Sequence, residues 1–414
     1  MTKMEVTIDH IGARGDGIVE TDKGPIYVPL TLPGEEVMIE LEGNRGTLLE
    51  ITSPSPDRQE PPCAHFGTCG GCSLQHQSAK TYLEWKRQQV VRALKAQGID
   101  APVNDIHACA PQSRRRANFG AMRTRKTVKF GFFERGTHTI VDLANCPVIA
   151  PEIESVLPAL AKLVAPGLTR KGQASVAVTL TSSGLDVDVT GGKKDPDLAL
   201  REQLAIRAHE ADIARLSWDG EIISERRAPM LNLSGIEVAL PPGAFLQATH
   251  EGEIQLVSMV VDAIGNAKTV IDLYAGCGTF SLALAKTRKV HAVEGAAAQC
   301  ASLETAVNRF GPAVGLKPLT VERRDLARRP LGSIELNKYE AVVIDPPRAG
   351  AAKQMEDLAW SDVPTVVSVS CNPATFARDA RTLIGGGYRL ESTTPLDQFL
   401  WSPHIEMVGI FKKG

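Results

Sequence analysis

The sequence lacks the features that mark membrane, secreted or strongly basic proteins. No apolar run is long enough to cross a bilayer, and the first residues, Met1–Glu5, include no apolar stretch resembling a signal peptide. We therefore expect a cytoplasmic protein with no membrane partner. The formal net charge of −2 does not by itself indicate a nucleic-acid partner, so the distribution of charge matters more than its total.

The positions of the cysteines are the most informative feature of the sequence for the chemistry of the protein. Disulfides are rare in cytosolic proteins, so the eight cysteines indicate thiol chemistry or metal ligation. Cys63, Cys69 and Cys72 lie close together on a glycine-containing loop, and Cys146, followed by proline, is a candidate fourth ligand. Four thiolates suit an iron–sulfur cluster or zinc. Structural zinc sites usually pair two short Cys-x2-Cys segments, and only one such segment is present here.

The 414 residues suggest two or three domains. Residues 1–55 contain short apolar runs separated by turn residues, a pattern typical of a small β-barrel. Residues 56–240 are expected to form a central α+β domain that holds the cysteines. Within it, residues 79–97 are helical in pattern and are expected to pack against the C-terminal domain, residues 241–414. A basic stretch between Arg114 and Lys129 is a candidate phosphate-binding surface.

Residues 241–414 alternate between apolar strand-like runs and helical patterns, which predicts a parallel, doubly wound sheet. Ligands bind such sheets outside the carboxyl ends of the strands. The segment Asp272–Phe280 follows the first strand, and Gly276 and Gly278 let the backbone approach a ligand closely. Glu294 ends the next strand and could accept both ribose hydroxyl protons.

This loop favours S-adenosylmethionine over a dinucleotide. A pyrophosphate needs a third glycine, and Ser281 occupies that position. The sulfonium and ammonium groups of S-adenosylmethionine prefer carboxylates and aromatic faces, which Asp272 and Tyr274 could supply. Asp325, after a third strand-like run, adds a further candidate contact.

Three more short segments follow later strands and should lie at the same ligand-binding end of the sheet. They are Asp345-Pro346-Pro347-Arg348, Ser370-Cys371-Asn372-Pro373 and His404-Ile405-Glu406. Together with Gly243-Ala244-Phe245-Leu246-Gln247, these segments resemble the RNA uracil-C5-methyltransferase family over nearly the whole chain. The resemblance implies that Cys371 is the nucleophile and Glu406 the base, and that Gln247 and Asp345 contact the cofactor or the base.

Uracil chemistry independently requires these residue types. Uracil C5 is too weak a nucleophile to attack a methyl group, but a thiolate that adds to C6 turns C5 into an enolate carbon. A base must then remove the C5 proton so that the cysteine can leave. The target base must also leave its stack to be reached.

The same resemblance implies an α/β Rossmann-like methyltransferase domain, a TRAM-like (OB-like) N-terminal barrel that binds RNA, and a [4Fe–4S] cluster on Cys63, Cys69, Cys72 and Cys146. Relatives with both barrel and cluster resemble enzymes of 23S ribosomal RNA, so that RNA is favoured over tRNA. No obligate protein partner is evident.

Other functions remain open at this point. They are a tRNA uracil-C5 methyltransferase, an amino-group methyltransferase that uses Asp345–Arg348 and needs no nucleophilic cysteine, and an iron–sulfur RNA-binding regulator without S-adenosylmethionine.

Overall fold

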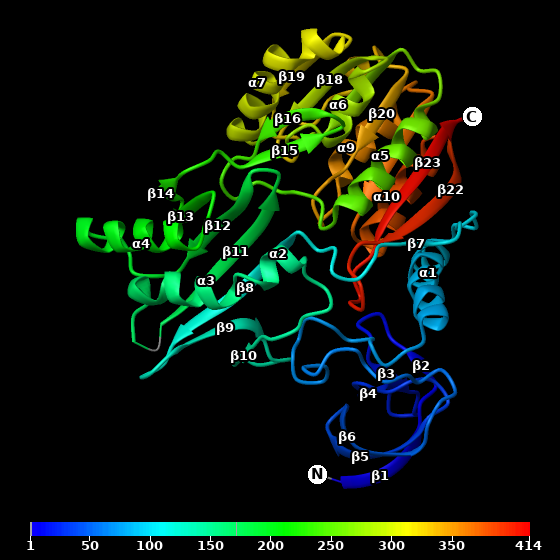
Figure 1. Cartoon of the computed structure of the whole chain (residues 1–414). Helices are drawn as coiled ribbons and strands as arrows, with labels where there is room; N and C mark the ends of the chain where they lie inside the picture. The colour runs from blue at the N-terminus through cyan, green and yellow to red at the C-terminus, as the bar shows by residue number, and fades with distance from the viewer. Residues whose placement is uncertain (1, 171) are drawn as a thin grey trace.

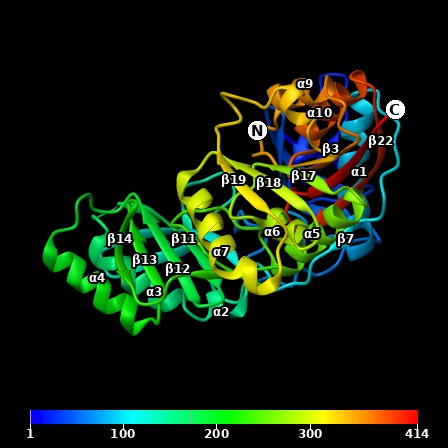
Figure 2. The same ribbon diagram turned by 90° about the horizontal axis from the view of Figure 1, so that it is seen from above.

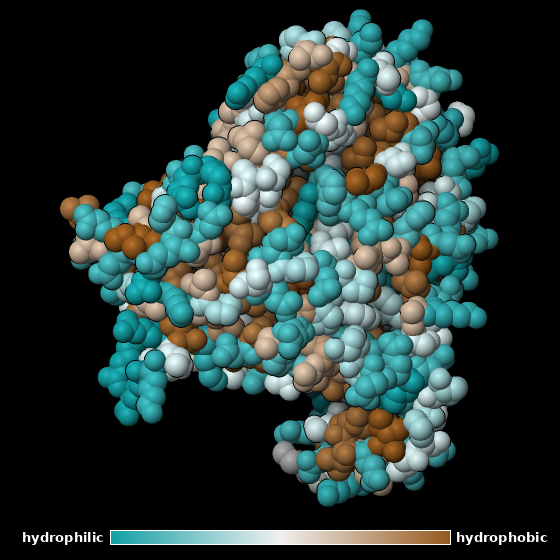
Figure 3. Space-filling view, viewed as in Figure 1, coloured by the Kyte–Doolittle hydropathy of each residue, from teal (hydrophilic) through white to brown (hydrophobic). Residues whose placement is uncertain are grey.

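The computed structural model describes residues 2–170 and 172–414, which form three large β-sheets and one two-stranded hairpin (Figure 1). The N-terminal sheet has the order β1-β5-β6-β4-β3-β2 and a buried core that includes Val28, Val37 and Ile39. It protrudes as a separate lobe (Figure 3). Its strands are β1 (Thr2–Thr7), β2 (His10–Ile11), β3 (Gly17–Val19), β4 (Ile26–Val28), β5 (Glu36–Glu42) and β6 (Arg45–Ser53).

The central sheet has seven strands in the order β10-β9-β8-β11-β12-β13-β14. Apolar residues of α3 and α4 pack with strand residues such as Val176 and Val187 in one core. This unit extends to one side of the eight-stranded C-terminal sheet (Figure 2). Its elements are β8 (Arg116–Arg123), β9 (Val128–Phe133), β10 (Ile140–Asp142), α2 (Pro151–Glu154), α3 (Leu157–Val164), a 3-10 turn (Ala165–Gly167), β11 (Gln173–Thr181), β12 (Gly184–Thr190), α4 (Leu198–Glu210), β13 (Arg215–Trp218) and β14 (Glu221–Glu225).

The catalytic sheet has eight strands in the order β19-β18-β17-β20-β21-β23-β22-β7. Successive side chains of its inner strands enter opposite cores: Val342 and Ile344 pack on one face, Ala341 and Val343 on the other. The strands are β17 (Thr269–Leu273), β18 (Lys289–Glu294), β19 (Leu319–Arg323), β20 (Ala341–Ile344), β21 (Thr365–Ser370), β22 (Tyr388–Asp397), β23 (Glu406–Lys413) and β7 (His107–Ala108). The helices are α5 (His250–Ile264), α6 (Thr279–Ala285), α7 (Ala297–Val314), α8 (Ser333–Leu336), α9 (Ala352–Ala359) and α10 (Pro373–Gly385).

The predicted Rossmann-like fold is confirmed, but the expectation of a purely parallel sheet is wrong at one edge. Strand β23 runs antiparallel to both β21 and β22. A non-helical segment, residues 398–405, joins β22 to β23, and a connection without a crossover helix returns the chain in the opposite direction.

Segments from before residue 241 also pack against the catalytic sheet. Helix α1 (Ala79–Ala96) contributes Val90 and Leu94 to the same core as β20 and β21. The hairpin of β15 (Met230–Leu233) and β16 (Ile236–Ala239) packs against α7 through a shared apolar cluster. In the described ranges, no helix combines the length and apolar character needed to span a membrane.

Candidate active site

Asp345, Cys371 and Glu406 meet at one edge of the catalytic sheet. Asp345 follows β20 and Cys371 follows β21, at the carboxyl ends of parallel strands. Glu406 is the first residue of β23, so it begins a strand, whereas the segment was expected to follow the carboxyl end of one. Because β23 is antiparallel, with Met407 paired to Ser370, its first residue still reaches the same edge.

These groups shift one another's protonation. Burial raises the pKa of the half-buried Cys371 thiol to about 11, with further increases from Glu406 and Asp345 and an opposing effect of Arg348. Burial also raises the pKa of Asp345 to about 7. For Glu406, burial and then the nearby Asp345 hold the pKa well above its ordinary value, while a hydrogen bond with Gln398 acts in the opposite direction. Buried carboxyls with raised pKa values are good proton acceptors.

A chain of amides connects these acids. Gln398 Nε2 donates to Gln247 Oε1 at 2.8 Å, and Gln247 Nε2 donates to Asp345 Oδ2 at 3.4 Å. Both glutamines are buried. The backbone of Gln247 is fixed from the other side, because its carbonyl accepts from Arg115 Nε at 3.1 Å.

The predicted cofactor loop has the backbone conformations that its glycines allow. Gly276 and Gly278 have φ values of 58° and 98°, and Tyr274 also has a positive φ, 62°. The two oxygens of Glu294 accept from the backbone N–H groups of Gly276 at 3.0 Å and Ala296 at 2.8 Å. A Cβ at Gly276 would meet nothing within 4 Å, so the loop has an open side where a ligand can approach.

The charged groups around this loop fit S-adenosylmethionine. Asp272 is fully buried, Ser281 Oγ donates to its Oδ2, and its Oδ1 has no hydrogen-bond partner. Such an orphaned carboxylate oxygen suits a cationic ligand group. Tyr274 and Asp325 are close enough for Asp325 to contribute, after burial, to the raised pKa of the tyrosine. The predicted cofactor residues therefore gather at the same sheet edge as Cys371.

The four predicted metal ligands, Cys63, Cys69, Cys72 and Cys146, all line one cavity of about 430 Å³, called here the cysteine cavity. Burial raises the pKa of Cys72 to about 12, and the charges of the other three thiols add to the increase. A thiol with so high a pKa is not ionised at neutral pH unless a positive group stabilises the thiolate, and a coordinated metal provides that stabilisation. Among the described residues, no three Cys, His, Asp or Glu side chains converge closely enough to hold a single ion.

The wall of the cysteine cavity fits an anionic cluster better than one ion. Arg114 and Arg135 line it, and its described lining includes no Asp or Glu. Arg135 Nη1 is buried without a hydrogen-bond partner, a donor left for an anionic occupant. A [4Fe–4S] core distributes its four thiolates over four irons, so its ligands need not converge on one point.

The cysteine cavity and the catalytic residues share one segment. The backbone N–H groups of Ser73 and Leu74 donate to the Trp401 carbonyl at 2.8 and 3.2 Å. The buried Lys86 on α1 donates to the Asp397 carboxylate and to the carbonyls of Phe399 at 3.0 Å and His404 at 2.8 Å. Residues 397–405 are thus fixed just before Glu406.

Sequence reasoning missed Lys86 and Gln398. Lys86 looks like any lysine of an amphipathic helix, and nothing local marks its burial. Gln398 had a weak signal, because it directly follows a strand whose carboxyl end lies at the ligand-binding edge.

The basic stretch divides into two parts. Arg115 pairs with the buried Glu253 at 2.6 Å, and the guanidinium groups of Arg114 and Arg116 lie over the rings of Phe399 and Phe245. These three arginines therefore have partners within the protein. Arg123, Arg125 and Lys126 instead line surface hollows next to α3.

Comparison with known proteins identifies the family of this chain. A family model described as tRNA (uracil-5-)-methyltransferase matches residues 235–413. An RNA methyltransferase of Brucella suis is 48% identical over 99% of this chain and 98% of its own. The 23S rRNA (uracil(1939)-C(5))-methyltransferase RlmD of Vibrio vulnificus is 30% identical over 99% and 96%. The structure of the Pyrococcus abyssi tRNA (uracil-54, C5)-methyltransferase with S-adenosyl-L-homocysteine superimposes with a TM-score of 0.77 over 99% of both chains, at 22% identity. The chain belongs to the family of S-adenosylmethionine-dependent RNA (uracil-5-)-methyltransferases.

Proposed function

We propose that this enzyme methylates C5 of a uridine in 23S ribosomal RNA through a covalent adduct between Cys371 and uracil C6. The observation that carries the covalent route is the meeting of Cys371, Glu406 and Asp345 at one sheet edge. An amino-group methyltransferase has no use for a thiol beside a buried carboxyl.

The residues have distinct roles in this reaction. S-adenosylmethionine supplies an electrophilic methyl group on a sulfonium. The Cys371 thiolate adds to C6, and the electron pair of the C5–C6 double bond moves onto C5 and O4. The Gln247 N–H donates to O4 and stabilises the charge there, while the Asp345 carboxyl accepts from N3–H of the base. C5 then bonds to the methyl group and S-adenosylhomocysteine leaves.

Glu406 completes the reaction by removing the C5 proton. The C5–C6 double bond then re-forms and the thiolate is expelled from C6. One proton is released overall for each methyl group transferred. The high pKa of Glu406 suits it to accept this proton.

The substrate assignment has separate support. The Vibrio vulnificus relative that covers the whole chain is named for 23S ribosomal RNA. The Pyrococcus abyssi tRNA enzyme shares the fold at 22% identity, so the fold alone does not distinguish the two RNAs. We also propose that the N-terminal sheet is a TRAM-like RNA-binding unit.

We propose that the cysteine cavity holds a [4Fe–4S] cluster. After anaerobic reconstitution, we expect about four irons and four sulfides per chain, and a loss of both in Cys72→Ser but not in Cys109→Ser. Stoichiometric zinc in place of iron in the purified protein would contradict the proposal.

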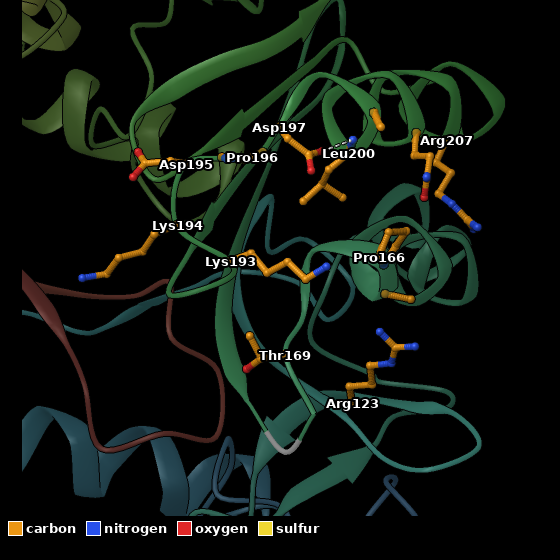
Figure 4. Close-up of a pocket in the computed structure, with 13 residues that line it drawn as sticks. Arg123, Pro166, Thr169, Lys193, Lys194, Asp195, Pro196, Asp197, Leu200 and Arg207 are labelled. Carbon is orange, nitrogen blue, oxygen red and sulfur yellow. Dashed lines mark hydrogen bonds between the residues drawn. The ribbon is translucent and has the colours of Figure 1, made fainter.

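Seven basic side chains line two adjoining hollows of about 800 and 500 Å³ at the far end of the central sheet. Figure 4 shows the 800 Å³ hollow, which four of these side chains line. The seven are Arg123, Arg125, Lys126, Lys162, Lys193, Lys194 and Arg207. None of them forms an ion pair within the described part of the chain, whereas Arg201, on the same helix as Arg207, pairs with Glu221. We propose that these cations contact RNA phosphates.

The phosphate contacts can be tested by charge reversal. Lys193→Glu combined with Lys126→Glu should weaken RNA binding and lower the salt dependence of the affinity. Arg201→Glu is the matched control from the same unit. Equal losses in both proteins would contradict a phosphate-binding role.

Methyl transfer from labelled S-adenosylmethionine to unmodified 23S ribosomal RNA and to unmodified tRNA tests the function itself. We expect 5-methyluridine in 23S ribosomal RNA, and none in a Cys371→Ala reaction. Product in tRNA alone would overturn the substrate assignment but keep the chemistry. No product on either RNA with cluster-loaded protein would overturn the proposed function.

A further inference from the structure

Gln398 lies at the centre of the buried polar groups of the site without being one of the predicted site residues. It follows β22, and only 2% of its surface is exposed. Its Oε1 accepts from the backbone N–H of Ala248 at 3.0 Å, and its Nε2 donates to Gln247 Oε1 at 2.8 Å. Gly252 on α5 leaves room for it, because a Cβ there would approach Gln398 Cβ and Oε1 to 3.1 Å.

One backbone group determines the orientation of both amides. The N–H of Ala248 can only donate, so the Gln398 atom that faces it must be oxygen. The Gln398 nitrogen then faces Gln247, and a nitrogen can only donate there, so Gln247 must present its oxygen. The Gln247 nitrogen is therefore turned toward Asp345, where it lies 3.4 Å from Oδ2.

This orientation matters for the choice of pyrimidine. Gln247 keeps one N–H free for a substrate beside the Asp345 carboxyl, so the site offers a donor next to an acceptor. Uracil matches that pair with its O4 acceptor and N3–H donor. Cytosine has the reverse arrangement, an amino donor at C4 and an acceptor at N3. A reversed Gln247 amide would present oxygen and favour the cytosine amino group.

We propose that Gln398 is a positioning residue for pyrimidine specificity, because it holds the Gln247 amide in the orientation that selects uracil over cytosine. This inference rests on the proposed function of the site. The inference adds a residue that does not contact the substrate: Gln398, in the segment that leads from β22 to Glu406, would determine uracil selection through its hydrogen bond with Gln247.

Two variants separate this role from simple packing. Gln398→Glu keeps an acceptor for Ala248, and when its carboxyl is ionised it presents a second oxygen to Gln247, which requires that amide to reverse; the comparison is therefore made at a pH of about 8 or above. Gln398→Met keeps the shape and releases Gln247. Gln354→Met is the matched control, since Gln354 is equally buried in the same unit. Within the described residues its amide bonds only the backbone of Leu331, at 2.9 and 3.0 Å.

The experiment uses the full chain and two RNA fragments that span the uridine methylated by the wild-type enzyme, with 5-fluorouridine or 5-fluorocytidine at that position. After S-adenosylmethionine has methylated C5, the fluorine there cannot be removed as a proton, so the Cys371 adduct persists and its rate of formation can be read on a denaturing gel. We expect the uridine-to-cytidine rate ratio to fall roughly ten- to hundredfold in Gln398→Glu, and less in Gln398→Met. Gln354→Met should keep the wild-type ratio.

The alternative outcomes are distinct. An unchanged ratio in both Gln398 variants, or equal slowing with both RNAs, would show that Gln398 has only a structural role and overturn the inference while the proposed function stands. A wild-type enzyme that forms no adduct with the 5-fluorouridine RNA would overturn the proposed function and this inference with it.

Discussion

The cofactor loop and the cysteine cavity differ in the charge of the groups around them. Beside the loop, the buried carboxylate oxygen Asp272 Oδ1 has no hydrogen-bond partner; in the cavity, the guanidinium nitrogen Arg135 Nη1 and the neutral amide oxygen Gln75 Oε1 have none. Carboxyls surround the first site, while the described lining of the cavity holds arginines and no carboxyl. The first surroundings suit a cation and the second an anion. Thiols are present at both places, so the neighbouring charges, rather than the cysteines, indicate what each site binds.

The largest expected difference between the two sites comes from removing one thiol from each of them. Cys371→Ala should reduce methyl transfer by more than about a thousandfold, because it removes the nucleophile, while leaving iron content and folding unchanged. Cys72→Ala should instead lower the iron content and the stability of the protein, while the nucleophile Cys371 stays in place. Nucleoside mass spectrometry and iron analysis distinguish the two. Comparable effects of both changes on iron would contradict separate roles.

Removal of the proposed base should stop the reaction at a defined stage. In Glu406→Gln the methyl group is still transferred, but the C5 proton remains and the adduct cannot break down. Multiple turnover should fall by about 10²–10⁴-fold, and a methylated protein–RNA band should accumulate on denaturing gels. Rapid turnover without such a band would mean that another group removes the proton.

The segment shared by the two sites can be tested through Lys86. Lys86→Met leaves the Asp397 carboxylate buried without its cation, which typically costs about 3–5 kcal/mol. Urea unfolding measures the loss. Lys95→Met, exposed on the same helix, is the control and should change the free energy of unfolding by less than about 0.5 kcal/mol. Similar values for both variants would show that the Lys86 contacts do not stabilise this region.

The smallest expected effect concerns charge at the cofactor loop. Burial raises the pKa of Asp272 to about 7, so this carboxyl becomes negative only as the pH rises through that value. S-adenosylmethionine has a sulfonium that S-adenosylhomocysteine lacks. The ratio of their affinities should therefore shift toward S-adenosylmethionine between pH 6 and 8, by at most about tenfold per pH unit. Calorimetry measures both ligands, and a ratio independent of pH would contradict the assignment.

The sequence by itself was enough to predict the α/β class, the positions of Asp345 and Cys371 after strands, and the set of four cysteines. These features are local. Strand periodicity, glycine turns and the spacing of thiols depend on residues close together in the chain. The position of Glu406 could be predicted only in part from the sequence. Its strand is antiparallel to β21 and therefore reaches the shared edge of the sheet from the opposite direction.

Other features were decided by the tertiary structure alone. Gln398 orients Gln247 across 151 residues of sequence, and Lys86 contacts Asp397 across 311. Neither glutamine nor lysine has a local pattern that reveals a buried partner so far away. The basic stretch divides for the same reason: Arg115 finds Glu253 within the fold, while Arg125 remains at the surface. Burial and long-range pairing determine what a polar side chain does, and both arise only when the sheets and helices pack together.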